Sequence, residues 1–319
     1  MAVSDANTYL TYDQVGTRED LADVIYNIAP TECPFMQMIG RATASQKKHE
    51  WQVDSLAAAA VNAQLEGDDQ DATLPDKTTR LSNYCQISTK VLRISGTAEA
   101  TDKAGRRSEL AYQVAKMGKE LKRDMEFTLT GNYAIEDGAE GTARTTGSLE
   151  IWYQTAGNAS RTGTACDATL NQPDQNKTVT DGTQRVLTEG LMKTVIQGVW
   201  SEGGDPSILM SGPFNKRAIS GFTGGATRFD ISEDKKLVAA IDVYVSDFGT
   251  HRVIPNRFSR DRTLHVLTPS MWKVSYLRSF RQFPLAKTGD AEKRQLLAEY
   301  CLRSDEQKAS GVVADLTTS

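Results

Sequence analysis

The stretch that decides the fold reads His49-Glu-Trp-Gln-Val-Asp-Ser-Leu56 and, further on, Asn83-Tyr-Cys-Gln-Ile-Ser-Thr-Lys-Val-Leu-Arg-Ile-Ser95. Residues of different polarity alternate in both parts, which is the period of a half-exposed β-strand. We predict a long two-stranded hairpin, whose arms span roughly 50–60 Å at ~3.3 Å per residue. An isolated two-stranded ribbon is only marginally stable in water, so this hairpin needs a neighbour to lie on. The pattern therefore indicates a subunit of an assembly.

The predicted tip of this hairpin, residues 57–79, is acidic. An Ala-rich stretch is followed by five acidic residues, with Lys77 as the single basic residue nearby. The acidic residues are Glu66, Asp68, Asp69, Asp71 and Asp76. As a free loop the tip would be a solvated charge run, whereas in an assembly it would meet a basic surface of the next subunit. The charge also protects the hairpin from edge-to-edge aggregation. The acids lack the alternate spacing and fixed glycine of a calcium-binding loop, so we predict no calcium site.

A single long amphipathic helix is predicted over residues 108–132, with Ser108 as its cap. At ~100° per residue its apolar positions fall within an arc of ~120°; they are Leu110, Val114, Met117, Leu121, Met125 and Leu129. Such a one-sided stripe is typical of a helix that lies on a sheet. One polar flank is basic and consists of Lys116, Lys119, Lys122 and Arg123.

Two interpretations of this basic flank stay open. It is a solvated face with ion pairs such as Lys116–Glu120 and Lys122–Glu126, or it faces an acidic partner or packaged nucleic acid. Glu126 interrupts the otherwise regular division between the basic and the acidic flank.

A shorter helix is predicted before the hairpin. Thr17 is a cap residue, Pro30 ends the run, and Leu21 and Ile25 lie on its apolar face. This segment either packs on its own domain or forms an arm that docks on a neighbour. We favour the arm, in which Leu21 and Ile25 are candidate inter-subunit contacts.

The rest of the chain indicates a second unit inserted into the first. Residues 133–182 are rich in Gly, Ala, Thr, Ser and Asn and are expected to be irregular and exposed, anchored by Trp152 and Tyr153. A compact α/β module follows, with helices over 184–200 and from Pro213, and strands at 207–211, 236–247 and 250–255. Strands at 263–268, 273–281 and 294–303 are expected to return to the sheet under the long helix. The predicted fold class is therefore α+β.

Composition excludes several classes of protein. At 319 residues the chain can bury a real core, and its net charge of −4 gives no general basic field for nucleic acid. The start of the chain lacks a signal peptide, and no apolar run approaches the ~20 residues of a membrane span. We therefore expect a protein made in a cytosol, with no membrane contact.

No catalytic, cofactor or metal motif is visible. The motifs GxSxG, HExxH, GxxxxGK[ST] and GxGxxG are absent, and both Gly203-Gly204 and Gly224-Gly225 are interpreted as turns. The cysteines are far apart, with no CxxC pair, and are expected to be buried or incidental thiols; they are Cys33, Cys85, Cys166 and Cys301. We expect no enzyme, no cofactor and no metal, although a His/Asp/Ser set assembled from distant residues stays open.

Four stretches, in the correct order, are similar to one family of proteins. They read Arg18-Glu-Asp-Leu-Ala-Asp-Val-Ile-Tyr-Asn-Ile-Ala-Pro-Thr-Glu-Cys-Pro-Phe35, His49-Glu-Trp-Gln-Val-Asp54, Lys119-Glu-Leu-Lys-Arg-Asp-Met-Glu126 and Ser246-Asp-Phe-Gly249 with Val253-Ile-Pro-Asn-Arg-Phe258. Together with the order of the segments, they resemble the major capsid protein of tailed bacteriophages, in its podophage-like branch. That family has the Hong Kong 97-type fold.

The resemblance implies a division of the chain. Its parts would be an N-terminal arm at 1–45, an extended E-loop hairpin at 46–97, a P-domain at 98–182 with its spine helix at 108–132, an A-domain at 183–262, and returning P-domain strands at 263–319. It also implies the function of a structural protein, whose pentamers and hexamers form an icosahedral head that encloses double-stranded DNA.

The resemblance further implies partners and a location. Because the chain starts at the arm, without a coiled-coil scaffolding region, a separate scaffolding protein is expected; a portal and a decoration protein are further candidates. Contact with packaged DNA would be non-specific. The location would be the virion, after synthesis in the bacterial cytoplasm. Lys77 is the only lysine near the tip, and we predict no lysine–asparagine crosslink.

Two rival interpretations remain from the residues alone. An encapsulin-like compartment shares the fold and encloses enzymes, so protein cargo without DNA would favour it. A soluble enzyme with the α/β module as its catalytic unit predicts a small oligomer and a pocket with perturbed ionisable groups.

Overall fold

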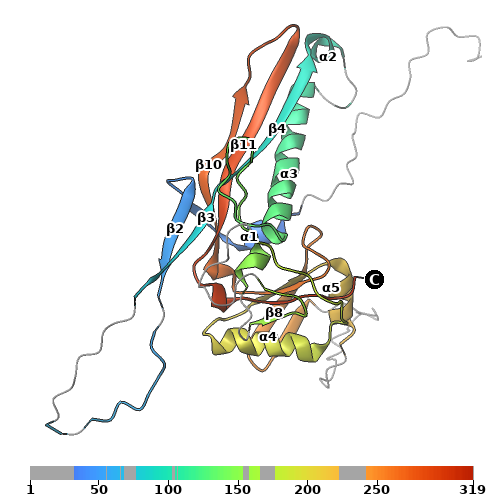
Figure 1. Ribbon diagram of the computed structural model, residues 1–319. Coiled ribbons are helices and arrows are strands. Elements are labelled where there is room, and N and C mark those ends of the chain that lie inside the picture. Colours follow the sequence, from blue (N-terminus) through green and yellow to red (C-terminus); the bar gives the residue numbers. More distant parts are fainter. Residues whose placement is uncertain are drawn as a thin grey trace, which may run out of the picture.

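The computed structural model describes residues 32–54, 56–64, 66–67, 77–102, 105, 107–153, 158–165, 177–222 and 242–318. The predicted N-terminal helix, with Leu21 and Ile25, lies outside these residues, as do Asp68, Asp69, Asp71 and Asp76 of the acidic tip. The described chain forms two packed units and a projecting two-stranded ribbon (Figure 1).

The first unit is a sheet with one long helix along its face (Figure 1). The sheet is four-stranded, in the order β1 (Gly40–Thr43), β10 (Trp272–Pro284), β11 (Ala291–Ser304) and β4 (Gln86–Ser95). β1 runs parallel to β10, while the other neighbours are antiparallel. Two short elements frame it, α1 (Pro34–Met38) and α2 (Gly96–Ala100).

The long helix is α3 (Glu109–Thr130), within two residues of the predicted bounds. The Ser108 hydroxyl accepts a hydrogen bond from the backbone N–H of Ala111 at 3.2 Å, which satisfies an otherwise unpaired donor of the first turn. Met117, Leu121 and Met125 of the predicted stripe are buried against the sheet. The amphipathic pattern is therefore confirmed, because the stripe does lie on β4 and β11.

The second unit is a six-stranded sheet with helices beside it. Its order is β5 (Ala159–Ser160), β12 (Gly311–Val313), β9 (Leu264–Leu267), β6 (Ile208–Ser211), β8 (Gly249–Pro255) and β7 (Val243–Ser246). The helix α4 (Glu189–Ser201) packs on β12 and β5, and α5 (Pro213–Ser220) packs on β8. Val195 and Val199 of α4 join the strand residues in one buried cluster.

The strand pairing of the ribbon differs from that of the predicted hairpin. β2 (Lys48–Val53) pairs with β3 (Thr79–Tyr84) alone, and Cys85 separates β3 from β4, which pairs with β11 instead. The prediction of one continuous return strand over 83–95 is therefore wrong. β4 alternates between half-buried and exposed residues, whereas the last four residues of β3 are all buried. Alternation in the sequence carries no information about which strand is the partner.

Two further expectations are corrected. β9 joins the six-stranded sheet between β12 and β6, not the sheet under α3, so residues 263–318 contribute to both units. The segment after α3 is also not exposed throughout, because it contains a fully buried 3-10 helix, η2 (Leu149–Trp152). Trp152 and Tyr153 are completely buried, as expected of anchors. Two further 3-10 helices of the described residues are η3 (Pro269–Met271) and η4 (Gln307–Ala309).

One continuous core joins the two units and the root of the ribbon. It includes Trp51 of β2, Trp152 of η2 and Trp272 of β10. The rings of Trp51 and Trp152 lie 5.6 Å apart between centroids, and Tyr153 meets Trp272 edge-on at 6.2 Å. Aromatic side chains bury large apolar areas, so this cluster fixes how the ribbon leaves the body. Among the helices of the described ranges, none has the length and apolar character needed to cross a membrane.

Candidate assembly surfaces

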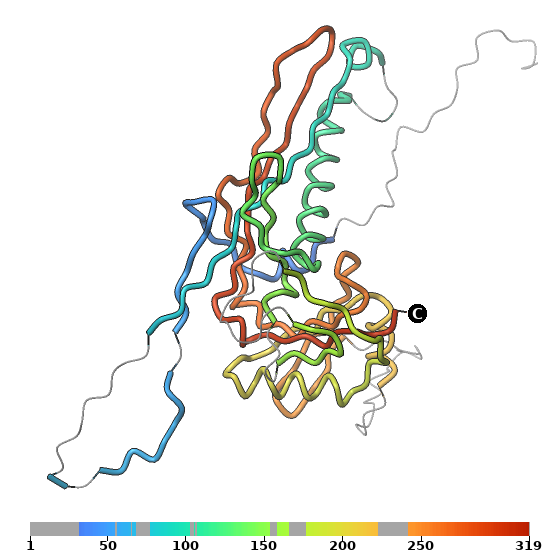
Figure 2. The backbone as a smooth tube through the Cα atoms, in the orientation of Figure 1, coloured from blue at the N-terminus to red at the C-terminus, as the bar shows by residue number. Residues whose placement is uncertain are grey.

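The outer part of the ribbon has no support from the body of its own subunit. Beyond β2 and β3 the described loop residues extend away from both units (Figure 2). The side chains of Leu56 and Val61 are 98% and 95% exposed, and Glu66 and Lys77 are exposed as well. These exposed apolar side chains beside charged groups make the segment a candidate contact surface.

The root of the ribbon, in contrast, is held firmly. Trp51 is buried, its ring lies 5.6 Å from that of His49, and the Arg303 guanidinium stands 5.8 Å from it. Leu81, on the facing strand, is fully buried. The ribbon therefore combines an anchored base with an exposed end, which is the arrangement expected of an element that reaches a neighbour.

The predicted basic flank divides in two. Lys116 and Lys119 are exposed, and Lys116 lies 3.9 Å from Glu120, as the solvated-face interpretation predicted. The ammonium group of Lys122 lies 6.0 Å from the ring centre of Phe280, and the Arg123 guanidinium lies 5.5 Å from that of Phe258. These two cations are thus held against aromatic faces of their own subunit. Lys116 and Lys119 remain the more available pair.

Glu126 has a different role from the one predicted. It is fully buried, so the expected Lys122–Glu126 pair on a solvated face is wrong. One carboxylate oxygen accepts hydrogen bonds from the backbone N–H of Phe35 and the side-chain amide of Asn256, both at 2.8 Å. The other accepts from the backbone N–H of Met36 at 2.9 Å. Burial raises the pKa of Glu126, and these hydrogen bonds oppose that rise.

This carboxylate therefore caps α1, whose own N-cap residue, Cys33, makes no side-chain cap. Three of the four stretches that carry the family resemblance, 18–35, 119–126 and 246–258, meet at Glu126. Sequence reasoning missed this role. The available signal was an acid that broke an otherwise regular charge pattern.

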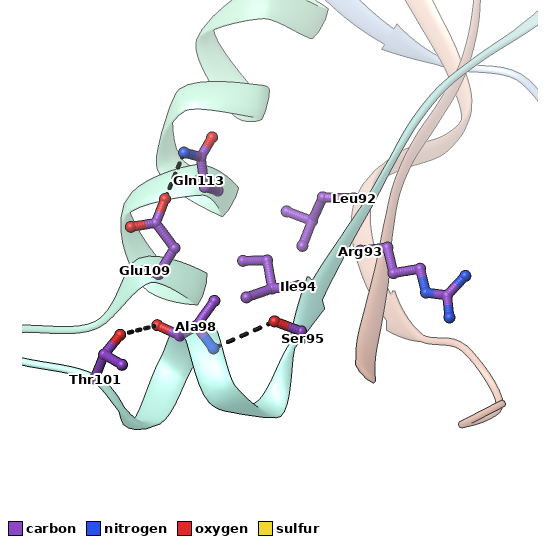
Figure 3. A pocket seen from close by; sticks show the side chains of 8 residues that line it. All are labelled: Leu92, Arg93, Ile94, Ser95, Ala98, Thr101, Glu109 and Gln113. Atoms are coloured by element: carbon purple, nitrogen blue, oxygen red, sulfur yellow. Dashed lines mark hydrogen bonds between the residues drawn. The ribbon is translucent and has the colours of Figure 1, made fainter. Parts of the chain in front are cut away.

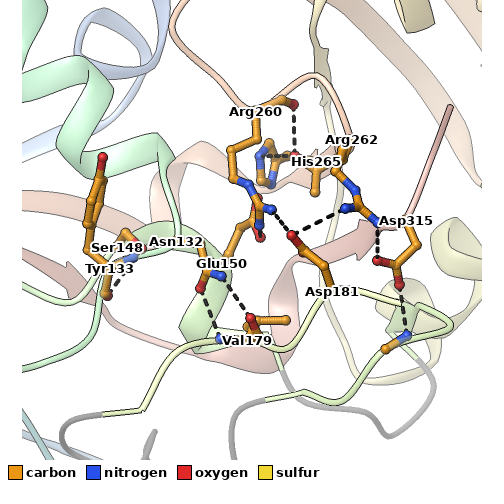
Figure 4. A network of polar contacts seen from close by, with 12 residues as sticks. Asn132, Tyr133, Ser148, Glu150, Val179, Asp181, Arg260, Arg262, His265 and Asp315 are labelled. Atoms are coloured by element: carbon orange, nitrogen blue, oxygen red, sulfur yellow. Dashed lines mark hydrogen bonds and ion pairs between the residues drawn. The ribbon is translucent and has the colours of Figure 1, made fainter. Parts of the chain in front are cut away.

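A second ionic network ties the six-stranded sheet to the segments around it (Figure 4). Arg260 donates to Glu150 at 2.6 Å and to Asp181, while Arg262 lies between Asp181 and Asp315. Asp315, with φ of 59°, also accepts from three backbone N–H groups, those of Thr162, Gly163 and Gly182. In this network each carboxylate has a guanidinium partner. These ion pairs hold the segments around the six-stranded sheet in place.

His265 belongs to the same region and is fully buried. Burial, together with the positive charge of Arg260 and Arg161, lowers the pKa of His265 to about 3. Its ring stacks on Tyr153 with 5.7 Å between centroids. A histidine with so low a pKa is a neutral packing group near neutral pH. Within the described ranges, no three His, Cys, Asp or Glu residues gather in a way that would hold a metal ion.

A pocket of about 730 Å³ opens at the far end of the first unit, between β4, α2 and the start of α3. Leu92 and Ile94 point into it from β4, whereas the Arg93 side chain points away (Figure 3). Its polar lining includes Glu109, which accepts a hydrogen bond from Gln113 at 2.7 Å. Among the residues that line the pocket, Arg93 is the one cation.

The fold is that of solved phage capsids. The capsid of the native GTA particle matches with a TM-score of 0.65 and 8% sequence identity, covering 96% of this chain and 98% of that one. The asymmetric unit of the cyanophage A-1(L) capsid matches with a TM-score of 0.64 and 12% identity, covering 97% and 99%. At such identities the matches establish the fold alone. The chain has the Hong Kong 97-type fold of shell-forming subunits, as predicted.

The family follows from sequence comparison. The model of the SU10 major capsid protein family matches residues 5–317, and the chain therefore belongs to this family. The major capsid protein of Escherichia phage Phieco32 is 28% identical over an alignment 346 positions long, which covers 98% of this chain and 97% of that protein. The predicted class, a bacteriophage capsid protein, is confirmed.

Proposed function

We propose that copies of this major capsid protein close an icosahedral head of pentamers and hexamers around packaged double-stranded DNA. The observation that carries the proposal is the family match over residues 5–317. A closed shell needs one subunit to make similar contacts in several surroundings, which symmetric assembly of a single chain provides. Family membership also weighs against the encapsulin-like interpretation, because the family is one of virion proteins.

We further propose a role for each unit. The ribbon with its loop would be the E-loop, α3 with the four-stranded sheet the P-domain, and the six-stranded sheet with α4 and α5 the A-domain. Leu21 and Ile25 remain candidate contacts of an arm. A separate scaffolding protein, a portal and a decoration protein remain proposed partners, DNA contact would be non-specific, and synthesis would take place in the bacterial cytoplasm.

The mechanism that this arrangement supports is geometric. Burying one Leu or Val side chain against a neighbour contributes about 1.5–3 kcal/mol. Leu56 and Val61 are available for such burial because the body of their own subunit leaves them exposed. Each copy in a shell would repeat the contact, so modest individual contributions combine into a stable particle.

Shell formation is the direct test. Expressing the chain alone and with a candidate scaffolding protein, then imaging by negative stain, is expected to show closed particles of uniform diameter. Packaged heads from an infected host should contain double-stranded DNA. Discrete small oligomers under every condition would contradict the proposal, and particles with protein cargo and no DNA would support the encapsulin-like rival.

Charge reversal tests the proposed contact between the acidic tip and the basic flank. We expect Lys116→Glu with Lys119→Glu to lower subunit stability by less than about 1 kcal/mol, because both side chains are exposed and only the weak Lys116–Glu120 pair is lost. Losing the attraction and adding repulsion costs about 1–2 kcal/mol per contact, which raises the protein concentration needed for assembly roughly tenfold. Light scattering against protein concentration measures this change.

The control keeps the charge. Lys116→Arg with Lys119→Arg should assemble normally, and adding Glu66→Lys, Asp68→Lys and Asp69→Lys to the reversed variant should restore part of the lost assembly. If the charge-reversed variant assembles at the wild-type concentration in low salt, the basic flank is not the partner of the tip.

A further inference from the structure

Two buried cysteines face each other at the root of the ribbon. Cys85 is the single residue between β3 and β4, and Cys301 lies in β11. The register that pairs Tyr300 with Gln86 continues to place Cys301 opposite Cys85. Both side chains are fully buried and share a small cluster with Ala44. The third described cysteine, Cys33, lies elsewhere, at the start of α1.

The geometry of this pair suits a covalent bond. Residues directly opposite each other in antiparallel strands have Cα atoms about 4.5–5.5 Å apart. Disulfides span Cα separations of about 4.4–6.8 Å, a range that includes the spacing of opposite residues in such a pair of strands. Both side chains also pack into the same small buried cluster.

Cys85 is also tied to the other strand of the ribbon. Its backbone N–H donates to the carbonyl of Lys47 at 2.8 Å, and its thiol donates to the carbonyl of Gln46 at 3.7 Å. Ala44, just before these residues, donates its N–H to the Tyr276 carbonyl of β10 at 2.9 Å. The ribbon thus meets the four-stranded sheet at residues 44–47 on one side and at Cys85 on the other.

We propose that Cys85 and Cys301 form a redox-sensitive site, a dithiol that a peroxide converts into a cross-strand disulfide which fixes the ribbon to the sheet. The Cys85 thiolate attacks one oxygen of hydrogen peroxide, the O–O bond breaks, and the departing hydroxide takes up a proton to form water. Cys301 then attacks the Cys85 sulfur of the resulting sulfenic acid, the S–O bond breaks, and a second water leaves with the Cys301 proton. Two thiols lose two electrons, and the peroxide accepts them.

The order of the two cysteines follows from their contact. The hydrogen bond between the thiols lowers the pKa of Cys85 and raises that of Cys301, so Cys85 is the attacking group. Reducing agents of a cytosol keep such pairs as thiols, so the bond would form after the chain leaves that compartment. This timing rests on the proposed function, whereas the bond itself does not.

The test uses the full-length subunit and needs no variant. The reduced, folded protein is treated with hydrogen peroxide, the peroxide is removed, and the protein is unfolded in denaturant so that all remaining thiols can be alkylated. Peptides are then mapped by mass spectrometry without reduction. We expect one linked peptide pair containing Cys85 and Cys301, lighter by two hydrogens and released by dithiothreitol. Closing so long a loop should raise the Tm by about 5 °C or more.

Single cysteine variants test whether the linked pair depends on Cys85 and Cys301 alone. Cys33→Ser should form the linked pair as the wild type does, while Cys85→Ser and Cys301→Ser should each abolish it. Alkylation of both Cys85 and Cys301 after the peroxide-treated protein is unfolded, or a bond from either one to a different cysteine, would overturn the proposal. Because the linkage is measured on isolated subunits, a failure here is distinct from a failure to form shells.

Discussion

Deleting residues 58–78 is expected to leave a folded subunit that no longer forms closed shells. The described residues of this segment are exposed, and the ribbon keeps its anchors, Trp51 and Leu81, when the segment is removed. The subunit therefore loses little of its own packing, while every contact that this segment makes with a neighbour disappears. Because such contacts act together in a shell, we expect at least a roughly hundredfold loss of assembled particles.

Sedimentation and negative-stain imaging measure the loss, and thermal unfolding checks the fold, with Tm expected within about 2 °C of the wild type. A variant in which Gly and Ser replace the same residues at equal length separates the reach of the loop from its side chains. A Leu56→Ser, Val61→Ser variant tests the exposed apolar groups alone. Normal particles from the deletion variant would show that this segment is not an assembly element.

Replacing Glu126 by alanine is expected to cause the largest loss of subunit stability of any single change on α3. The substitution leaves the N–H groups of Phe35 and Met36 and the Asn256 amide without their acceptor, and it opens a cavity. Each buried donor left unpaired costs about 1–3 kcal/mol. We expect the free energy of unfolding to fall by about 3 kcal/mol or more, measured by chemical denaturation.

Glu126→Gln keeps the shape but offers one acceptor oxygen, so its loss should be smaller, about 1–3 kcal/mol. Glu120→Gln, a partly exposed site on the same helix, should change stability by less than about 0.5 kcal/mol. Because burial raises the pKa of Glu126, the folded state holds that proton more tightly than the unfolded state. The stability that protonation of Glu126 contributes is thus fully present below the ordinary pKa of glutamate. It is lost as the pH rises through the raised pKa of the folded state.

The pH dependence provides an independent check, since Glu126→Gln should remove this part of the slope of stability against pH and Glu120→Gln should not. A Glu126→Ala protein as stable as the wild type would mean that α1 is held by other contacts. Proteolysis near residues 34–38, compared between the two glutamine variants, shows directly whether α1 is released.

Periodicity predicted the helices well because a one-sided apolar stripe has a single stable way to be buried. The stripe of Met117, Leu121 and Met125, together with the Ser108 cap, placed α3 within two residues. The second unit followed for similar reasons, since Pro213 does begin α5. The start of α4 was predicted a few residues early, because the effective cap is Thr188 and not a residue at 184.

Partner choice between strands could not be predicted in the same way. Residues 86–95 alternate as a hairpin strand would, yet they pair with β11, because pairing depends on which edges the rest of the fold leaves available. Glu126 was assigned to solvent because its charge favours exposure, and only the approach of α1 and Asn256 supplies the donors that make its burial tolerable. Long-range contacts of this kind leave little trace in the local pattern.

The parallel pairing of β1 with β10 has a mechanical consequence. A tension applied to the chain at residue 32 first reaches α1, where the Glu126 carboxylate holds Phe35 and Met36, and only then reaches β1. When β1 is pulled along its length, the four residue pairs that join it to β10 are loaded in shear. They therefore resist the force together and do not open one after another. Force arriving from the N-terminal side is thereby spread over α3 and the longest strands of the subunit.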